Sequence, residues 1–324
     1  MLSAYGEIKI FAGSTGINFA KKISKCLNTE LGDSETIQFS DGNLFVRINE
    51  PVRDKDVYLL QPIANDPNKE FVEILFWMDA FKRASANSVT AIIPYFSYAK
   101  GDKKDEPRVS IRARVCAESI ELAGADRIMT MDLHSPQVQG FFKKPVDHLL
   151  AMNTLCEYVY EQGMNENLVV VSPDAGFAKQ ARKYAFHLKA PVAIGDKTRL
   201  GHDENAQVLE LIGDVCGKNC LIVDDFTISG GTLINIAEAL KEHGARKIYA
   251  CVSHIVMKQK SIKAIQDSPI DLLISTDTVE NEWLQTSNKI KIVSVAPIFA
   301  ETVRRIHFRE SVSPLFDSFL PKRS

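Results

Sequence analysis

The chain has 324 residues, of which 45% are hydrophobic and 25% charged, and its formal net charge is −2. This composition is typical of a globular protein, and the length predicts about two domains. No apolar run approaches the roughly 20 residues that span a bilayer, and the first residues lack the basic and apolar regions of a signal peptide. The near-neutral charge argues against nucleic-acid binding. Six scattered cysteines indicate reduced thiols and a cytoplasmic location. From the charge and the lack of a long apolar run, we expect neither nucleic acid nor a membrane as partner.

Short runs rich in β-branched residues alternate with longer amphipathic segments along the whole chain. Strands are predicted at 57–60, 89–94, 127–131, 168–172, 220–223, 247–253, 271–275 and 291–295. Helices are predicted at 70–85, 113–123, 150–162 and 232–243. Strands separated by helices predict βαβ units and a mostly parallel sheet with covered faces. The pattern runs through both halves, which predicts an α/β fold of two domains joined near Pro145.

Acidic residues follow several of these strands. Asp132 comes after the strand at 127–131, Asp174 after the strand at 168–172, and Asp277 after the strand at 271–275. Asp224 and Asp225 follow the strand at 220–223. In open α/β sheets, ligands bind beyond the carboxyl ends of the strands. The acidic turns therefore predict a binding site at that edge.

A small-residue turn follows the acid pair and opens a helix. The turn is Ser229-Gly230-Gly231-Thr232. Glycines let backbone N–H groups close around a phosphate, and the helix N-terminus adds a favourable dipole. Carboxylates accept hydrogen bonds from vicinal sugar hydroxyls, so the segment predicts a sugar-phosphate pocket. An ordinary strand–turn–helix joint with a Ser or Thr cap is the alternative, but such a joint does not call for two adjacent acids.

The segment resembles the phosphoribosyl-diphosphate loop that type I phosphoribosyltransferases share with the ribose-phosphate diphosphokinases. The resemblance to the diphosphokinases covers nearly the whole chain, in blocks at 39–42, 48–50, 82–86, 123–127, 131–134, 139–142, 145–147, 172–176 and 311–313. It implies two similar type I phosphoribosyltransferase-like domains, each with a mostly parallel sheet flanked by helices. The expected domains are 1–147 and 148–302, with a C-terminal tail, 303–324, that packs back on the first.

The resemblance also implies an activity. In this family the anomeric hydroxyl of ribose 5-phosphate attacks the β-phosphorus of ATP, which gives 5-phosphoribosyl 1-diphosphate for nucleotide biosynthesis and releases AMP. Mg2+ is the implied cofactor, and a homo-oligomer of dimers, up to a hexamer, is the implied assembly. The sequence has no G-x-x-x-x-G-K-[ST] motif, so a P-loop does not bind the ATP.

Residue roles follow from matching this sequence to the family blocks. The expected catalytic residues are Lys197 and Arg199, a cationic pair on a loop that suits phosphoryl oxygens. The expected ATP-binding residues are Phe39, Asp41, Gly42, Asn43, Lys100, Gly101 and His134. The expected ribose 5-phosphate ligands are Arg199, Asp224, Asp225, Ile228, Ser229, Gly230, Gly231 and Thr232. The expected metal ligands are Asp132, His134 and Asp174, which offer oxygen and imidazole donors.

Several positions depart from the common family pattern. Asn43 replaces a glutamate, and Lys100-Gly101 replaces an arginine–glutamine pair, which removes a planar guanidinium. Pro51 replaces a serine of the phosphate effector site, although Arg53, Ser85, Ser311 and Ser313 match. Ile228 stands where nucleobase transferases carry an acid. A nucleobase phosphoribosyltransferase and a non-catalytic regulatory homologue remain the alternatives to the diphosphokinase.

Overall fold

The computed structural model describes residues 6–199 and 207–316, and the side chains of 196–199 and 207–209 lie outside that description. The chain forms two compact units. Unit 1 comprises the chain up to Leu150, the short segment Thr278–Glu280 and the chain from Val295 onward. Unit 2 comprises Ala151–Asp277 and Asn281–Ser294. Each unit has its own sheet and its own core.

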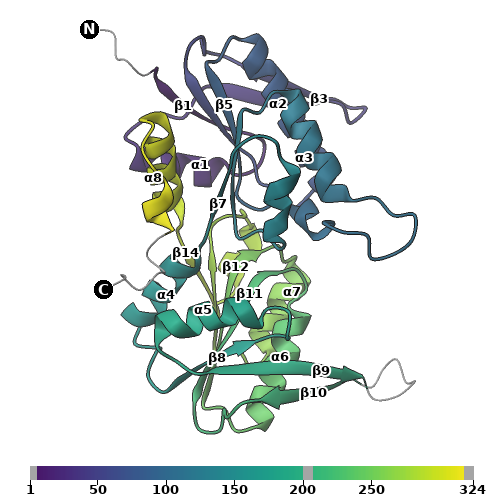
Figure 1. Cartoon of the computed structure of the whole chain (residues 1–324), viewed down its shortest axis with the longest axis vertical. Coiled ribbons are helices and arrows are strands. Elements are labelled where there is room, and N and C mark those ends of the chain that lie inside the picture. The colour runs from purple at the N-terminus through teal and green to yellow at the C-terminus, as the bar shows by residue number, and fades with distance from the viewer. Residues whose placement is uncertain (1–5, 200–206, 317–324) are drawn as a thin grey trace. The chain divides into compact units, whose positions relative to one another are not determined.

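The sheet of unit 1 has five parallel strands, in the order β1-β4-β5-β6-β7; β1, β5 and β7 are labelled in Figure 1. Their bounds are β1 Ile8–Ala12, β4 Asp56–Leu60, β5 Ser88–Ile93, β6 Arg127–Met131 and β7 Val146–Leu149. An antiparallel hairpin, β2 (Ser34–Gln38) and β3 (Leu44–Ile48), stands apart from this sheet.

Helices cover both faces of this sheet. Side chains alternate along each strand, so each face presents its own set of side chains to the helices that cover it. The helices are α1 Ile17–Cys26, α2 Pro67–Arg83, α3 Arg112–Ala123 and α8 Ala296–His307, with short 3-10 turns η1 Ser97–Lys100, η2 Pro136–Phe141 and η4 Ser313–Leu315. On β4, Val57 and Leu59 join the core beneath α2 and α3. Tyr58, between them, points the other way and donates a hydrogen bond to the carbonyl of Val303 on α8.

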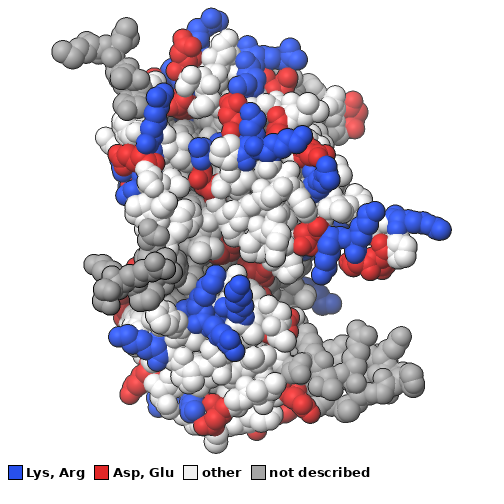
Figure 2. Space-filling view, in the orientation of Figure 1, with Lys and Arg blue, Asp and Glu red and all other residues white. Residues whose placement is uncertain are grey.

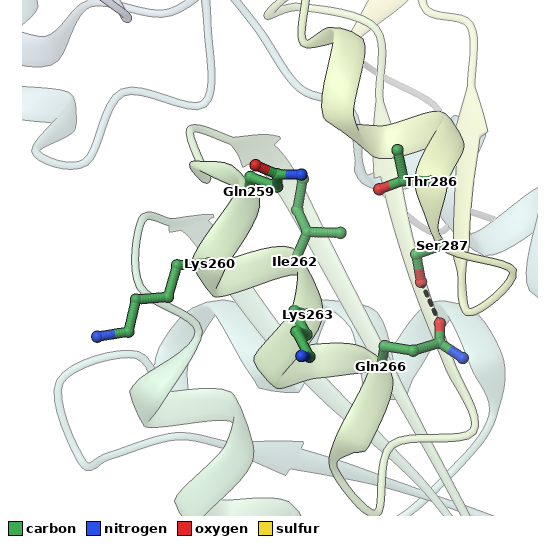
Figure 3. Close-up of a pocket in the computed structure, with 7 residues that line it drawn as sticks. All are labelled: Gln259, Lys260, Ile262, Lys263, Gln266, Thr286 and Ser287. Carbon is green, nitrogen blue, oxygen red and sulfur yellow. Dashed lines mark hydrogen bonds between the residues drawn. The ribbon is translucent and has the colours of Figure 1, made fainter.

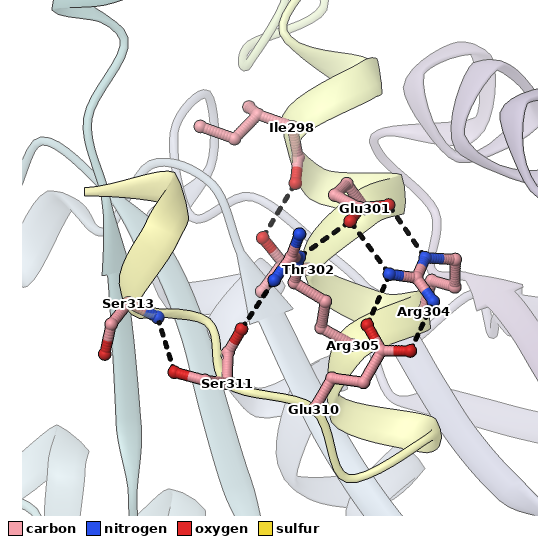
Figure 4. Close-up of polar contacts among 8 residues, drawn as sticks. All are labelled: Ile298, Glu301, Thr302, Arg304, Arg305, Glu310, Ser311 and Ser313. Carbon is pink, nitrogen blue, oxygen red and sulfur yellow. Dashed lines mark hydrogen bonds and ion pairs between the residues drawn. The ribbon is translucent and has the colours of Figure 1, made fainter. Parts of the chain in front are cut away.

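The C-terminal helix α8 is held to unit 1 at both ends. Phe299 packs edge-on against Phe19 of α1 at 5.3 Å between ring centroids, and His307 Nδ1 lies 2.8 Å from the Asp56 carboxylate. In the last turns of α8, Arg304 bridges Glu301 of the same helix and Glu310 beyond its end, as Figure 4 shows. This bridge fixes the chain as it turns from α8 toward Ser311 and Ser313, whose own contacts also appear in Figure 4.

Unit 2 contains a seven-stranded sheet in the order β10-β9-β8-β11-β12-β13-β14. The bounds are β8 Leu168–Ser172, β9 Val192–Arg199, β10 Gln207–Ile212, β11 Asn219–Thr227, β12 Lys247–Ile255, β13 Leu272–Thr276 and β14 Ile290–Val293. All neighbours are parallel except β10, which is antiparallel to β9. The helices are α4 Met152–Glu161, α5 Ala178–Leu188, α6 Gly231–Glu242 and α7 Gln259–Asp267, with the 3-10 turn η3 Glu282–Thr286.

The strand order reverses between β8 and β11. From β8 the chain moves through α5 to β9 on one side, and from β11 it moves through α6 to β12 on the other. Right-handed crossovers in opposite directions place α5 and α6 on opposite faces of the sheet. The carboxyl ends of β8 and β11 are then the place where an open α/β sheet binds its ligands.

The α/β prediction is confirmed, since both units have mostly parallel sheets flanked by helices. The strands predicted at 127–131 and 168–172 have the observed bounds. Within the described residues, no helix combines the length and apolarity of a membrane span. On the face in Figure 2, lysines and arginines are interspersed with acidic residues rather than gathered in one basic patch.

Candidate active site

The acid pair of unit 2 lies within a strand, not in the turn that the sequence predicted. β11 continues past the expected end at 223 because its backbone keeps pairing with β12 as far as Thr227. The strand turns Asp225 inward, where 9% of the residue is exposed, and leaves Asp224 partly exposed. Asp224 Oδ1 accepts the N–H of Asp225 at 2.9 Å, and Asp225 Oδ1 accepts the N–H of Phe226 at 2.8 Å. These bonds fix both carboxyl groups.

The electrostatics of this pair favour a ligand that brings positive charge or hydroxyl donors. Burial raises the pKa of Asp224 well above its ordinary value, and the neighbouring charges of Asp225 and then Asp174 raise it further. Negative charge is therefore costly here. A sugar hydroxyl or a cation between the carboxylates offsets that cost.

Asp174 reaches the same region from the neighbouring strand. β8 pairs with β11, with Val171 opposite Ile222, and Asp174 follows β8 by two residues. Its Oδ1 accepts the N–H of Phe177 at 2.9 Å, while the Ser172 hydroxyl donates to its carbonyl at 2.7 Å. The side chain is thus held in an exposed turn. Unit 2 therefore brings Asp174, Asp224 and Asp225 together at the point where the strand order reverses.

The small-residue turn after β11 has the geometry of a phosphate loop. Gly230 adopts a left-handed conformation, with φ of 79°, and a Cβ there would lie 3.1 Å from side-chain atoms of Met257 and Ile265. Glycine therefore meets both a backbone and a packing requirement. Ser229 Oγ accepts the N–H of Gly231 at 3.3 Å. Apart from the N–H of Gly231, the N–H groups of the first turn of α6 have no carbonyl partner within the helix, which suits an anion at this helix N-terminus.

Lys197 and Arg199 lie in a strand, which corrects the predicted loop. Their backbone forms the end of β9, paired antiparallel with β10, so that Lys197 faces Leu209 and Arg199 faces Gln207. Pairing within this two-stranded ribbon satisfies the backbone hydrogen bonds of the charged segment. The side chains of both residues lie outside the described part of the chain.

In unit 1, the first group of predicted nucleotide ligands forms the turn of the β2–β3 hairpin. Phe39 and Asn43 pair across the turn, with the Phe39 N–H donating to the Asn43 carbonyl at 2.8 Å. Asp41 Oδ1 accepts the N–H of Asn43 at 3.0 Å. Gly42 has φ of 89°, which favours glycine. All five residues, 39–43, are exposed in this unit.

The second group lies at the ends of β5 and β6. Lys100 Nζ is 5.8 Å from the centre of the Tyr95 ring, and Gly101 is buried at the end of η1. The next residue, Asp102, accepts a hydrogen bond of 2.7 Å from the hydroxyl of Ser135. That bond joins the segment after β5 to the segment after β6, which carries Asp132 and His134. Sequence reasoning missed it, because the two residues are 33 positions apart.

Asp132 and His134 occupy a constrained turn. Asp132 has φ of 38°, an uncommon conformation outside glycine, and its N–H donates to the Leu149 carbonyl at 3.0 Å. His134 is exposed. Such turns persist when the surrounding structure fixes them, and they cluster at functional sites.

Two of the predicted metal ligands, Asp132 and Asp174, have donors that suit Mg2+, and the imidazole of His134 suits a hydrogen bond to a water of the hydrated ion. Carboxylate oxygens are its preferred protein ligands, and Mg2+ in phosphate-transfer sites is held by one or two carboxylates together with substrate phosphates. Among the described residues, no group of three or more His, Cys, Asp and Glu side chains is arranged to bind a metal. The negative charge of Asp174 helps to raise the pKa of Asp224. A cation bound at Asp174 would therefore reduce the repulsion between these carboxylates.

A groove of about 480 Å³ lies elsewhere in unit 2, between α7 and η3 (Figure 3). Its lining residues are Gln259, Lys260, Ile262, Lys263, Gln266, Thr286 and Ser287. None of them is a predicted site residue. The Gln266 carboxamide and Ser287 hydroxyl bond to each other at 2.5 Å, so part of its polar lining is already satisfied.

Comparisons with known proteins show which protein family the chain resembles. The model for the N-terminal domain of ribose phosphate pyrophosphokinase matches residues 8–124, and the model for the phosphoribosyl synthetase-associated domain matches residues 202–317. The chain is 43% identical over 319 residues to a ribose-phosphate pyrophosphokinase of Clostridium tetani, which covers 98% of this chain and 99% of that protein. It is 45% identical over 310 residues to that of Caldanaerobacter subterraneus subsp. tengcongensis, covering 96% and 98%.

A solved structure agrees with these relatives. The crystal structure of phosphoribosylpyrophosphate synthetase from Mycobacterium smegmatis matches with a TM-score of 0.88 and 34% identity, over 94% of this chain and 99% of that one. The two family models together cover more than half of the chain, and the relatives match it almost from end to end. The chain therefore belongs to the ribose-phosphate pyrophosphokinase family of enzymes.

Proposed function

We propose that this chain transfers the β,γ-diphosphate of ATP to the C1 hydroxyl of ribose 5-phosphate, giving 5-phosphoribosyl 1-diphosphate and AMP. The observation that carries the proposal is the β11–α6 segment of unit 2. There, the fixed carboxyl groups of Asp224 and Asp225 lead directly into the glycine turn at Gly230. This order suits a pentose phosphate, with hydroxyls at the acids and the phosphate at the helix N-terminus.

The proposed reaction forms one P–O bond and breaks another. The C1 oxygen of the pentose attacks the β-phosphorus, the bond from that phosphorus to the α-bridging oxygen breaks, and the hydroxyl proton is released. Asp224 and Asp225 orient the pentose by accepting hydrogen bonds from its hydroxyls, while Ser229 and the first turn of α6 bind its phosphate. Lys197 and Arg199 are the proposed donors to the transferred phosphoryl oxygens, where fixed positive charge lowers the barrier.

The proposed nucleotide site combines the two groups of unit 1. Lys100, Gly101 and His134 stand at the ends of β5 and β6, and Asp102 and Ser135 hold these ends together. Phe39, Asp41, Gly42 and Asn43 form the exposed hairpin turn. The aromatic ring of Phe39, half exposed, suits an adenine face.

Mg2+ is the proposed cofactor. Asp132 and His134 of unit 1 would hold an ion bound to the nucleotide, and Asp174 of unit 2 would hold a second ion near the pentose. When bound, the ion neutralises charge on the phosphate oxygens during transfer.

We also propose a homo-oligomer, built from dimers and extending to a hexamer. A ligand-binding turn that is exposed throughout residues 39–43 suits a site completed by a second copy. We propose a cytoplasmic location as well, because the six cysteines are free thiols, which suits a reducing compartment. Mass measurement in solution at micromolar concentration tests the assembly, and a fully active monomer contradicts it.

The activity is tested by incubating the protein with ATP, MgCl2 and ribose 5-phosphate and measuring AMP. AMP that appears only with the pentose phosphate supports the proposal. A nucleobase phosphoribosyltransferase would instead consume a base together with 5-phosphoribosyl 1-diphosphate. A regulatory homologue would produce no AMP alone, and either result contradicts the proposed reaction.

A further inference from the structure

Gly101 has no side chain, and the space that a side chain there would need is occupied by Arg112. A Cβ built on Gly101 would lie 2.7 Å from Nε, 3.0 Å from Cβ and 3.3 Å from Cζ of Arg112. Contacts this close force the arginine side chain to move. The backbone of Gly101, with φ of −99°, is open to any residue, so only the position of the Arg112 side chain opposes a side chain at 101.

The backbone holds Arg112 at this position. The carbonyl of Gly101 accepts the N–H of Ala113 at 3.1 Å, which anchors the first turn of α3 on the end of η1. Gly101 is itself fixed through its N–H, which donates to the Tyr98 carbonyl at 2.9 Å. Arg112, the first residue of α3, is therefore positioned by hydrogen bonds on either side of Gly101.

This places the guanidinium in the proposed nucleotide site of unit 1. Lys100 precedes Gly101, and Asp102 follows it and bonds to Ser135, the residue after His134. Arg112 thus lies against the short segment that joins the ends of β5 and β6.

Among the described residues, no carboxylate forms an ion pair with Arg112 that would explain its charge. Arg114, two residues along the same helix, pairs with Glu118 at 3.0 Å. Arg112 is exposed, and no ion pair joins it to a carboxylate within the described part of unit 1. A cation in the first turn of a helix is also disfavoured by the helix dipole. An arginine at the start of a helix, with no described carboxylate paired to it, suits the binding of an anionic ligand.

We infer that Arg112 binds the phosphates of ATP and that Gly101 is a glycine in order to admit it. The inference rests on the proposed function and adds a specificity-determining pair to it. A planar guanidinium donates two parallel hydrogen bonds to phosphate oxygens, whereas Lys100 beside it supplies a point charge. Gly101 and Arg112 therefore act as one unit, in which a side chain at 101 excludes the guanidinium.

The test compares Arg112→Ala, Arg112→Lys, Gly101→Ala and the double variant Gly101→Ala/Arg112→Ala by steady-state AMP formation. Loss of charge-assisted hydrogen bonds predicts that Arg112→Ala raises the KM for ATP at least about tenfold and leaves the KM for ribose 5-phosphate unchanged. Arg112→Lys falls between it and the wild type. Gly101→Ala raises the KM similarly, and the double variant is no worse than Arg112→Ala alone. Arg114→Ala, the matched control, behaves as wild type.

Two inhibitors identify the part of ATP that Arg112 binds. Tripolyphosphate should inhibit Arg112→Ala at least about tenfold more weakly than wild type, while adenosine inhibits both equally. An unchanged KM for ATP in Arg112→Ala, additive effects in the double variant, or weakened adenosine inhibition alone overturns the inference. The melting temperature of each variant shows whether it is folded. If Arg112→Ala does not fold, the same measurements are made with Arg112→Lys. A wild type that forms no AMP contradicts the proposed function instead.

Discussion

The imidazole Nε2 of His148 accepts a hydrogen bond of 2.8 Å from the backbone N–H of Leu133. Leu133 lies between Asp132 and His134, and His148 lies on the adjacent strand β7. The N–H of Asp132 is bound to the same strand through the Leu149 carbonyl. Strand β7 thus fixes the turn that carries two of the proposed metal ligands.

Replacing His148 by leucine is expected to loosen that turn. The N–H of the buried Leu133 loses its acceptor, at a cost of about 1–3 kcal/mol in stability. Initial rates titrated with MgCl2 should show a raised magnesium requirement, as should His134→Ala, which removes the proposed ligand itself. His148→Gln keeps an acceptor near Nε2 and should restore much of the wild-type titration. A leucine variant with an unchanged magnesium curve would make His148 merely a packing residue.

Lys197→Ala is expected to lower turnover by at least about a hundredfold and to leave ATP binding nearly intact. The expectation follows from a cation whose partner charge grows only during diphosphate transfer. Turnover and ATP binding are measured separately, with the exposed Lys183→Ala on α5 as control. If the variant keeps its turnover and loses ATP affinity, the transition-state role is wrong.

Asp224→Asn is expected to make the protein more stable and nearly inactive. The raised pKa of Asp224 shows that its charged form is disfavoured by burial and by Asp225. A neutral amide of the same shape removes that repulsion, so the melting temperature at pH 7 should rise. Asp214→Asn, which removes the charge of an exposed pair with Lys218 and keeps an oxygen for the N–H of Cys216, is the control. A variant that melts lower and keeps its activity contradicts both expectations.

Glu301→Gln is expected to lower stability at pH 7 but not in strong acid. Arg304 and then Arg305 hold the pKa of Glu301 down at about 2. A depressed pKa in the folded state means that the stability it contributes is present above the unfolded pKa of about 4.5. This stability is lost as pH falls through the folded value. The melting temperatures of wild type and variant should therefore converge between about pH 4.5 and 2. A constant difference across that range would show that packing, not charge, is responsible.

Activation by inorganic phosphate is expected to be weaker than in the common members of the family. Arg53, Ser85, Ser311 and Ser313 match the effector site, but Pro51 offers neither a hydroxyl nor a backbone N–H. Each missing bond to a charged group costs about 1.5–3 kcal/mol, or roughly one to two decades in affinity. Inhibition by ADP at that site should weaken likewise. Titration of initial rates with phosphate in a non-phosphate buffer measures this. Strict dependence that saturates at low phosphate would show that Pro51 is harmless.

The central strands of both units were predictable because they are buried on both faces. Runs such as 127–131 and 168–172 are continuous apolar or β-branched segments that end in polar turns, so both type and bounds could be identified. The family resemblance came from the same turns. The α/β fold and the acid pair ahead of the glycine loop therefore follow from local sequence.

The antiparallel pairs were missed for a related reason. β2 and the end of β9 are rich in polar residues, and β3 is a short run that is only partly buried, so none of the three has the long buried apolar run of a central strand. The family resemblance implied a loop around Lys197, but the backbone of this segment pairs with β10 instead.

Contacts between distant residues were beyond local patterns altogether. His148 and Leu133 are 15 positions apart, and the close approach of Arg112 to Gly101 depends on how α3 packs. The roles assigned to individual site residues stay predictions until the variants are measured.

The packing of α8 on unit 1 has a consequence for synthesis of the chain. Phe299 and His307 complete contacts with Phe19 and Asp56, yet they leave the ribosome some 250 or more residues after their partners. Unit 2, made of residues between Ala151 and Ser294, is synthesised in the interval. Since domains fold as units during synthesis, unit 2 can fold before unit 1 is complete. One face of the N-terminal sheet therefore stays incompletely covered until α8 has been synthesised.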